Sequence, residues 1–254
     1  MIKIINKKAQ IAIWVVIAIS IVAIIGLLFV FSKKPIGAGI DISDPKGRME
    51  KCAKDAVNEA AEIILRQGGF VEPKNYKLYQ NNKVTYLCEN TGNFKPCINQ
   101  HPLLLNEIKK EIVQYSYPII EFCFNDVKEE FEKRKYSASF AETKLNISLG
   151  GDRIYLNIEK DIELKKNDAI SRYEEFNVEI NNPTYDLAKV AIEIAGQESK
   201  YCYFEYVGYM ILYPRFDIKK FTMSDSTKIY TIKDKYSNKE MNIAIRGCAI
   251  PAGI

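Results

Sequence analysis

Six cysteines and one histidine are the residues of this sequence whose types suggest specific chemistry. No two cysteines form a C-x-x-C pair, and His101 is the only histidine that could join them. Zinc ligands usually come in closely spaced pairs, so this spacing disfavours a zinc site. An even number of cysteines instead favours three disulfides in an oxidising compartment over six buried thiols. The cysteines are Cys52, Cys88, Cys97, Cys123, Cys202 and Cys248.

Six cysteines allow 15 disulfide connectivities, and the sequence gives local guidance for only one pair. The second and third cysteines flank a short segment with Gly92 and Pro96, which is expected to turn and bring its ends together. Cys52 and Cys123 fall in predicted helices and become partners if those helices pack side by side. Cys202 and Cys248 then remain as the third pair. The expected pairs are Cys88–Cys97, Cys52–Cys123 and Cys202–Cys248.

Combinations of catalytic residues are largely missing. Ser–His and Cys–His nucleophile pairs would both need His101, which precedes Pro102 and is expected to be a surface residue where a helix starts. No nucleophile elbow, P-loop, H-E-x-x-H or dinucleotide-binding glycine motif occurs. Paired carboxylates could act on glycosidic bonds, but the sequence does not place two of them across a cleft. We therefore expect no enzyme, no cofactor and no metal.

A run of 21 uncharged residues, 11–31, follows a short basic segment. At about 1.5 Å of rise per residue it forms a helix about 31 Å long, which matches the roughly 30 Å hydrocarbon core of a bilayer. A secretory signal has a shorter apolar region of about 7–15 residues. We expect residues 11–31 to stay in the lipid bilayer as a transmembrane anchor.

The C-terminal side of this span is predicted to lie outside the cell membrane. Basic residues lie on both sides of the span, so their number alone does not orient it. Long segments translocate largely regardless of charge, and all six cysteines follow the span. Asn146 begins an Asn-Ile-Ser glycosylation sequon, which is compatible with an exterior location.

The segment Lys7-Lys8-Ala9-Gln10 stands directly before the apolar run. It resembles the class III, prepilin-type signals of archaeal surface proteins, in which a dedicated peptidase cuts before the Gln and the apolar helix remains on the mature protein. The resemblance implies processing between Ala9 and Gln10. The alternative is a plain signal-anchor whose lysines only set the orientation.

The charge of the chain is concentrated near its N-terminus. The net charge is +4, but residues 1–34 hold five lysines and no acidic residue, which leaves 31 basic against 32 acidic side chains beyond them. A nucleic-acid surface needs a concentrated basic face, so no nucleic-acid partner is expected.

The expected domain organisation has three parts. Residues 1–34 form the signal and anchor, residues 35–47 form a Pro- and Gly-containing linker, and residues 48–254 form one extracytoplasmic domain. Within it, residues 48–135 are predicted to be mainly helical. One helix begins at Pro45 and ends at Gly68-Gly69, and a second begins at Pro102 and is kinked or divided at Pro118. Its expected apolar stripe is Leu105, Ile108, Ile112, Tyr115, Ile119, Phe122, Cys123, Val127 and Phe131.

Residues 136–254 are predicted to be mainly β. Apolar residues alternate on both sides of Gly150-Gly151, so a two-residue hairpin there would pair Leu149 with Asp152. Further strands are predicted near residues 176–180 and 241–245, with a helix from Pro183 between them. The aromatic run 201–213 fits either a strand pair, which we favour, or an exposed sticky surface.

Several motifs together support a wider resemblance. These are the class III-like start, the helix 50–71 with its cysteine and terminal Gly-Gly, and the segment "IIEFCFNDV" before an alternating β region. The chain is similar in these respects to single-pass surface proteins of small-genome archaea that bring no established activity. The predicted class is α+β, with an N-terminal transmembrane helix followed by one extracytoplasmic domain of packed helices and an antiparallel β-sheet.

Three functions are compatible with these observations. The first is a membrane-anchored surface or envelope protein with an interaction or structural role, whose partners would be other surface proteins. The second is a minor or adhesive pilin-like filament subunit, and the third is a membrane-tethered extracellular enzyme. The broken helix at Pro35 and the large outer domain argue against a major pilin with a long continuous stem.

Overall fold

The structure is a computed structural model that describes residues 44–90, 92 and 95–247. These residues form an α+β unit with two sheets and four helices. The predicted anchor at residues 11–31 and the processing residues Ala9 and Gln10 lie outside the described residues. In chain order the elements are α2 (Pro45–Arg66), β1 (Tyr76–Tyr79), β2 (Asn82–Glu89), β3 (Ile98–Asn99), α3 (Leu104–Lys133), β4 (Ser137–Phe140), β5 (Lys144–Gly150), β6 (Arg153–Lys166), β7 (Ala169–Asn181), α4 (Thr184–Tyr201), α5 (Tyr206–Leu212), β8 (Phe216–Thr222), β9 (Lys228–Asp234) and β10 (Glu240–Arg246).

Helix α2 begins and ends at the residues that the sequence indicates. The side chain of Asp44 accepts a hydrogen bond from the Gly47 amide at 2.8 Å, and Pro45 occupies the first helical position. Gly68 and Gly69 follow with φ of 75° and 108°, a conformation that favours glycine. A Cβ at Gly69 would also lie 2.7 Å from the side chain of Leu104, so the turn allows α3 to approach closely.

Helix α3 is a single helix that contains Pro118, so of the two expected alternatives, a kink or a division, the division does not occur. Proline removes one backbone donor, and the acceptor that loses it is the carbonyl of Gln114. Both residues face solvent, where water can satisfy that carbonyl. Just after Pro118 the buried positions are Ile120 and Phe124, one residue later than expected, and Phe122 is 73% exposed. The expected positions Val127 and Phe131 are buried.

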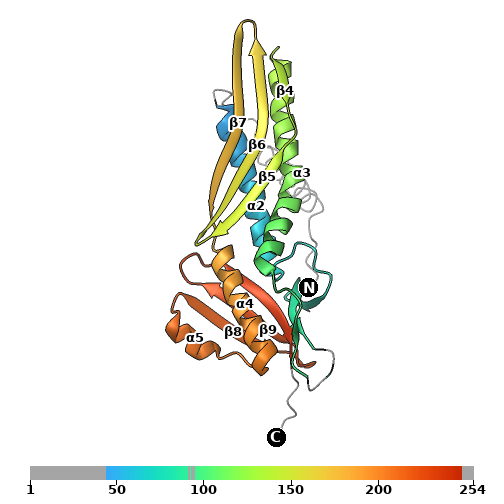
Figure 1. The fold of residues 1–254 in the computed structure, drawn as a ribbon, viewed down its shortest axis with the longest axis vertical. Helices are drawn as coiled ribbons and strands as arrows, with labels where there is room; N and C mark the ends of the chain where they lie inside the picture. The colour runs from blue at the N-terminus through green and yellow to red at the C-terminus, as the bar shows by residue number, and fades with distance from the viewer. Residues whose placement is uncertain (1–43, 91, 93–94, 248–254) are drawn as a thin grey trace, which may run out of the picture. The chain divides into compact units, whose positions relative to one another are not determined.

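The first sheet, called the hairpin sheet, contains β4 to β7 and packs against α2 and α3 (Figure 1). All its strand pairs are antiparallel, and β6 is central. The β5–β6 turn corrects the expected register. Its central residues are Gly151 and Asp152, so Leu149 pairs with Ile154 rather than with Asp152. This two-residue shift keeps every side chain on its expected face, and the positive φ of Gly151 fits a turn with glycine in its first central position.

The second sheet, called the mixed sheet, has the order β1-β2-β10-β9-β8, with β3 paired to β2. Strands β2 and β10 are parallel, so this sheet is mixed, and the expected antiparallel sheet corresponds to the hairpin sheet alone. Three of its strands, β1 to β3, come from the stretch 48–135, which was predicted to be mainly helical and for which no strand was named. Helix α4 contacts β2, β9 and β10, and Figure 1 shows it beside β8 and β9.

Candidate functional site

The structure forms two of the three expected disulfides. Cys52 of α2 is bonded to Cys123 of α3, with a Cα–Cα distance of 6.6 Å. Cys88 of β2 is bonded to Cys97, with a Cα–Cα distance of 5.3 Å. One bridge therefore joins the two helices behind the hairpin sheet, and the other closes a loop at the mixed sheet.

Only one cysteine of the third expected pair lies among the described residues. Cys202 is disulfide-bonded, and it ends α4 with a φ of 58°. Cys248 lies outside the described residues, so the pairing of Cys202 with Cys248 stays a prediction.

His101 and Asn146 take ordinary surface positions. The Nδ1 atom of His101 lies 3.0 Å from an Oε atom of Glu107, and its ring packs against Phe70 with centroids 4.6 Å apart. This arrangement holds the histidine just before α3, between a carboxylate and an aromatic ring. Asn146 is exposed on β5, which leaves its glycosylation a prediction.

The run 201–213 forms the end of α4 and the short helix α5, so the favoured strand pair is wrong. The side chain of Glu205 accepts a hydrogen bond from the Gly208 amide at 3.2 Å and thereby caps α5. The Tyr203 hydroxyl donates to the same carboxylate at 2.6 Å. Both hydrogen bonds lower the pKa of Glu205, and the bond from Tyr203 has the larger effect. A local cap thus overrides the strand preference of the aromatic residues.

Helix α5 lies beside the outer edge of β8. The Ile218 amide donates to the Met210 sulfur at 3.1 Å, and the next strand, β9, pairs with the other side of β8. An uncovered edge strand is a template for pairing with another chain. Helix α5 therefore protects this edge while keeping its own outer surface free.

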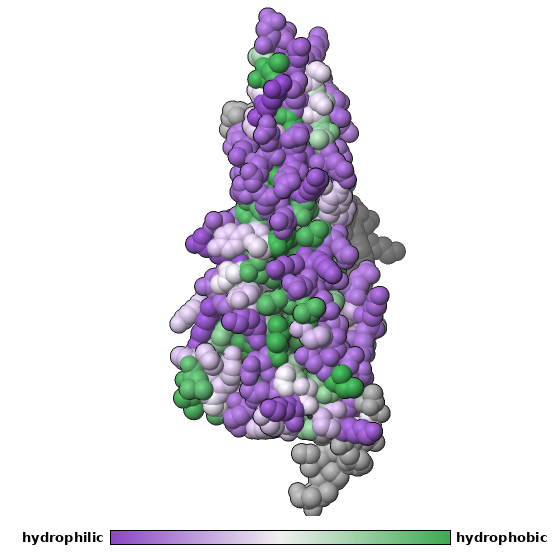
Figure 2. All heavy atoms as spheres, viewed as in Figure 1, coloured by the Kyte–Doolittle hydropathy of each residue, from purple (hydrophilic) through white to green (hydrophobic). Residues whose placement is uncertain are grey.

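That outer surface is apolar, although none of the seven residues of α5 is buried. Figure 2 shows hydrophobic residues gathered at the lower left, over α5. Neighbouring exposed apolar residues of this kind mark interaction sites more often than isolated ones do. We call this surface the α5 face, and it consists of Val207, Ile211, Leu212 and Tyr213, which are 50%, 76%, 75% and 51% exposed.

A cavity of about 790 Å³, the α4–α5 groove, adjoins the α5 face. One wall is a polar side of α4, and the other is the aromatic segment that joins α5 to β8, together with the β9–β10 turn. This volume falls within the range of about 300–1,000 Å³ that is usual for small-ligand sites. The groove is lined by Asp186, Lys189, Val190, Glu193, Gln197, Tyr209, Leu212, Tyr213, Pro214, Arg215, Phe216 and Tyr236.

Arg215 fixes the base of the groove. Its guanidinium donates to Asp234 at 2.7 Å and to Asp186 at 2.8 Å, and it also donates to Asp152. Asp152 belongs to the β5–β6 turn of the hairpin sheet, Asp186 to α4 and Asp234 to β9. The hydrogen bond to Asp234 is the main cause that raises the pKa of Arg215, so the side chain stays charged. One arginine thus connects the two sheets and α4.

The aromatic wall combines packed and exposed rings. The rings of Tyr209 and Tyr213 have centroids 4.6 Å apart, and Tyr209 also packs against buried Phe204 at 5.3 Å. Burial is the main cause that raises the pKa of Tyr209. Tyr236 is 80% exposed, with its ring beside the Arg215 guanidinium at 5.7 Å. Phe204 and Tyr209 therefore form the packed inner part of the wall, and the rings of Tyr213 and Tyr236 remain accessible.

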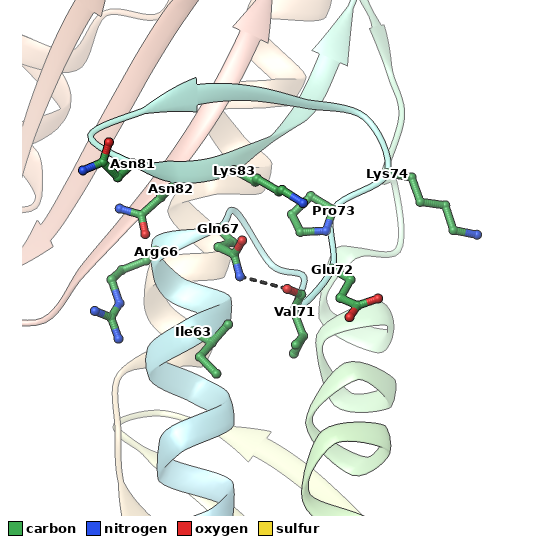
Figure 3. Close-up of a pocket in the computed structure, with 10 residues that line it drawn as sticks. All are labelled: Ile63, Arg66, Gln67, Val71, Glu72, Pro73, Lys74, Asn81, Asn82 and Lys83. Atoms are coloured by element: carbon green, nitrogen blue, oxygen red, sulfur yellow. Dashed lines mark hydrogen bonds between the residues drawn. The ribbon is translucent and has the colours of Figure 1, made fainter.

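A second cavity, of about 710 Å³, lies between the end of α2 and the β1–β2 turn (Figure 3). Its lining is polar, but the side chains do not converge on one point. Figure 3 shows Arg66 and Lys74 extending away from each other, while Gln67 is occupied by a hydrogen bond of 2.8 Å to the Val71 carbonyl. This cavity is the weaker candidate for a ligand site.

Two buried charged clusters have structural partners. Lys160 donates to Glu121, to the Ala141 carbonyl and to Thr143, which joins β6 to α3. Glu198 of α4 accepts from Tyr230 at 2.5 Å and from Lys228 at 2.6 Å. Their hydrogen bonds satisfy these groups, so neither cluster indicates a catalytic role.

Within residues 44–90, 92 and 95–247, no group of three or more His, Cys, Asp and Glu side chains is arranged to hold a metal ion. The helices in this described part of the chain all lack the combination of length and hydropathy that a membrane crossing needs.

The class that the fold defines is a disulfide-bonded α+β domain with an exposed apolar helix beside a groove. Comparison of the chain with protein-family models, curated proteins and solved structures gives no match. The α5 face and the α4–α5 groove are therefore the features that indicate a function.

Proposed function

We propose that this chain is a membrane-anchored extracytoplasmic surface protein whose outer domain binds a partner through the α5 face and the α4–α5 groove. The anchor is the predicted span at residues 11–31, and the resemblance to archaeal class III signals supports a surface location. The disulfides support an oxidising exterior, because such bonds are rare in the cytosol. The observation that carries the binding role is α5, an apolar helix with no buried residue.

The position of α5 in the domain agrees with this role. The predicted anchor and linker lead into the first turn of α2, where Arg48 pairs with Asp126 at 2.7 Å and also with Glu130. The other end of α2 contacts the mixed sheet, since the Thr85 amide donates to the Gln67 carbonyl at 3.1 Å. Helix α5 contacts the mixed sheet, so the first turn of α2 and the α5 face belong to different regions of the domain.

The membrane topology is tested by adding protease to intact cells that express the full chain. The part after Lys34 should be digested, because it is exposed outside the membrane. Full protection in sealed cells, with digestion only after lysis, would overturn the extracytoplasmic assignment.

The binding face is tested in the same cells with a photo-crosslinking amino acid at position 211 of α5. A matched control carries it at position 170 of β7, because Ile170 is also exposed, at 51%, but lies on the hairpin sheet. We expect discrete adducts from position 211 and none from position 170. Adducts from position 170 alone would show that binding uses another surface.

A further inference from the structure

The α4–α5 groove has two chemically different walls, and this difference restricts the ligands that fit it. Lys189, Glu193 and Gln197 follow each other at four-residue spacing on one side of α4. At 1.5 Å of rise per residue they form a polar strip about 12 Å long. Tyr213, Pro214 and other residues of the opposite wall offer ring faces and apolar edges.

We propose that this groove binds a neutral carbohydrate chain, an inference that rests on the binding role proposed above. A pyranose ring has one or two faces of C–H groups and a rim of hydroxyl groups. The C–H faces pack on aromatic rings, and each hydroxyl can both donate and accept hydrogen bonds. A ligand of this kind meets both walls at once.

The aromatic wall is suited to the faces of such a ligand. Tyr213 and Tyr236 are 51% and 80% exposed at the groove, while Tyr209 is held behind Tyr213 by its contact with Phe204. Tyrosine supplies a large contact area at a low cost in conformational entropy. The wall is therefore prepared for stacking before a ligand arrives.

The polar wall is suited to the hydroxyl rim. The Gln197 amide donates to the Glu193 carboxylate at 2.7 Å, which orients both side chains. Lys189 offers donors, Glu193 offers acceptors, and Gln197 offers both. A row of mixed donors and acceptors matches a polyol better than it matches a ligand with only one type of group.

The charges of the groove favour a neutral ligand. Asp186 is already paired with Arg215 at 2.8 Å, and Lys189 and Glu193 have opposite charges one helical turn apart. The charges of the four charged residues that line the groove, the two pairs Asp186–Arg215 and Lys189–Glu193, sum to zero, so a strongly charged polymer gains little electrostatic attraction from this lining. The Phe216 and Ile218 amides of β8 already donate to the Tyr213 carbonyl and the Met210 sulfur, which leaves fewer edge groups of this strand for pairing with an extended peptide.

The experiment uses the full chain in phospholipid nanodiscs, since detergents with sugar headgroups would compete for the groove. Maltotriose, cellotriose and N,N′,N″-triacetylchitotriose are titrated by calorimetry, and contacts are mapped by saturation-transfer NMR. We expect saturable binding of at least one trisaccharide, with saturation passing to its ring C–H protons. Tyr213→Ala and Tyr236→Ala should each weaken that binding by about tenfold, because each removes one stacking surface.

Tyr155→Ala is the matched control, because this tyrosine is 39% exposed on β6 of the hairpin sheet, and it should leave the affinity unchanged. Absence of saturable binding for all three trisaccharides would overturn the carbohydrate proposal. Binding of a proline-rich decapeptide that Tyr236→Ala abolishes, with no trisaccharide bound, would also overturn it, because such peptides use aromatic grooves as well. That result would leave the binding role of the groove intact. Absence of crosslinked adducts from position 211 would instead contradict the proposed binding role itself.

Discussion

In the hairpin-sheet region α2 and α3 bury regular apolar stripes against β4 to β7, whereas in the mixed-sheet region α5 buries no residue at all. Exposed large apolar residues of the first region are spread over different elements, as with Phe122 on α3 and Ile170 on β7. The second region also has scattered ones, such as Leu78 on β1 and Ile98 on β3, but four of its exposed apolar residues gather in the α5 face beside a groove. Isolated exposed residues are ordinary in proteins, but a contiguous group suggests a binding surface. This difference supports the proposal that one region is a scaffold and that the other binds a partner.

The largest expected effect concerns the two disulfides whose cysteines both belong to the described residues, one in each region. Replacing both Cys52 and Cys123 with Ser opens a loop with a sequence separation of 71 residues, which the chain-entropy relation values at about 4.4 kcal/mol. Replacing both Cys88 and Cys97 opens a separation of only 9 residues, valued at about 2.6 kcal/mol. Thermal unfolding of the purified full chain, followed by circular dichroism, should show the larger decrease in Tm for the helix–helix pair. An equal or reversed ranking would contradict the view that the hairpin-sheet region is the main scaffold.

A smaller effect is expected at the connection between the regions. Arg215→Met leaves the carboxylate of Asp234, which is 1% exposed, without its cation. We expect a loss of about 3 kcal/mol in the free energy of unfolding, because an uncompensated buried charge is costly. Urea denaturation measures it, and adding Asp234→Asn to Arg215→Met should restore part of the loss.

The control for this change is Arg172→Met. Arg172 pairs with Glu163 at 2.9 Å on the surface of the hairpin sheet, with side chains 68% and 42% exposed. Exposed pairs contribute little, so a loss below about 1 kcal/mol is expected. Similar losses for both arginines would show that Arg215 is an ordinary surface residue.

Local patterns were sufficient to predict much of the hairpin-sheet region. The cap at Asp44, the Gly-Gly end of α2 and the alternation around Gly151 are all signals within a few residues. The mixed sheet depends instead on contacts between distant segments. Its parallel pair joins Tyr86 to Ala244, and nothing in either short strand indicates that partner.

The candidate binding site was predicted only in part. The aromatic composition of the run 201–213 favours a strand pair over an exposed surface, but Glu205 caps a helix there. The groove brings together Glu193, Tyr213 and Tyr236 from three elements. Such a site appears only when the fold is known, because no single segment carries its pattern. The sequence signal that could have located one wall is the four-residue spacing of polar residues on α4.

Acid should weaken the mixed-sheet region before the hairpin-sheet region. The hydrogen bond from Lys77 is the main cause that lowers the pKa of Asp225 to about 2. Burial alone would raise the pKa of Asp234, but the bonds from Arg215 and Ser237 outweigh it and lower that pKa as well. A lowered carboxyl pKa gives stability that is present above the unfolded value of about 3.9 and is lost as the pH falls below it.

Hydrogen exchange at pH 3 and pH 6, corrected for intrinsic rates, measures this effect. Amides of β8 and β9 should lose protection at pH 3 more than amides of β6 do. Asp225→Asn should reduce the difference, because it removes one of the two responsible carboxylates. Uniform loss of protection in both sheets would contradict the localised effect.

The smallest effect on stability is expected from Ile211→Ala, and it separates folding from binding. Ile211 is 76% exposed on α5, so its truncation removes almost no buried contact and should change the free energy of unfolding by less than about 0.5 kcal/mol. The matched change Ile112→Ala removes a side chain that is fully buried in α3, and it should cost about 2–5 kcal/mol. Urea denaturation of the two variants compares the same substitution in the two regions. A loss above about 1 kcal/mol for Ile211→Ala would mean that the α5 face is part of the packed core, because a free binding surface contributes little to the stability of the unbound protein.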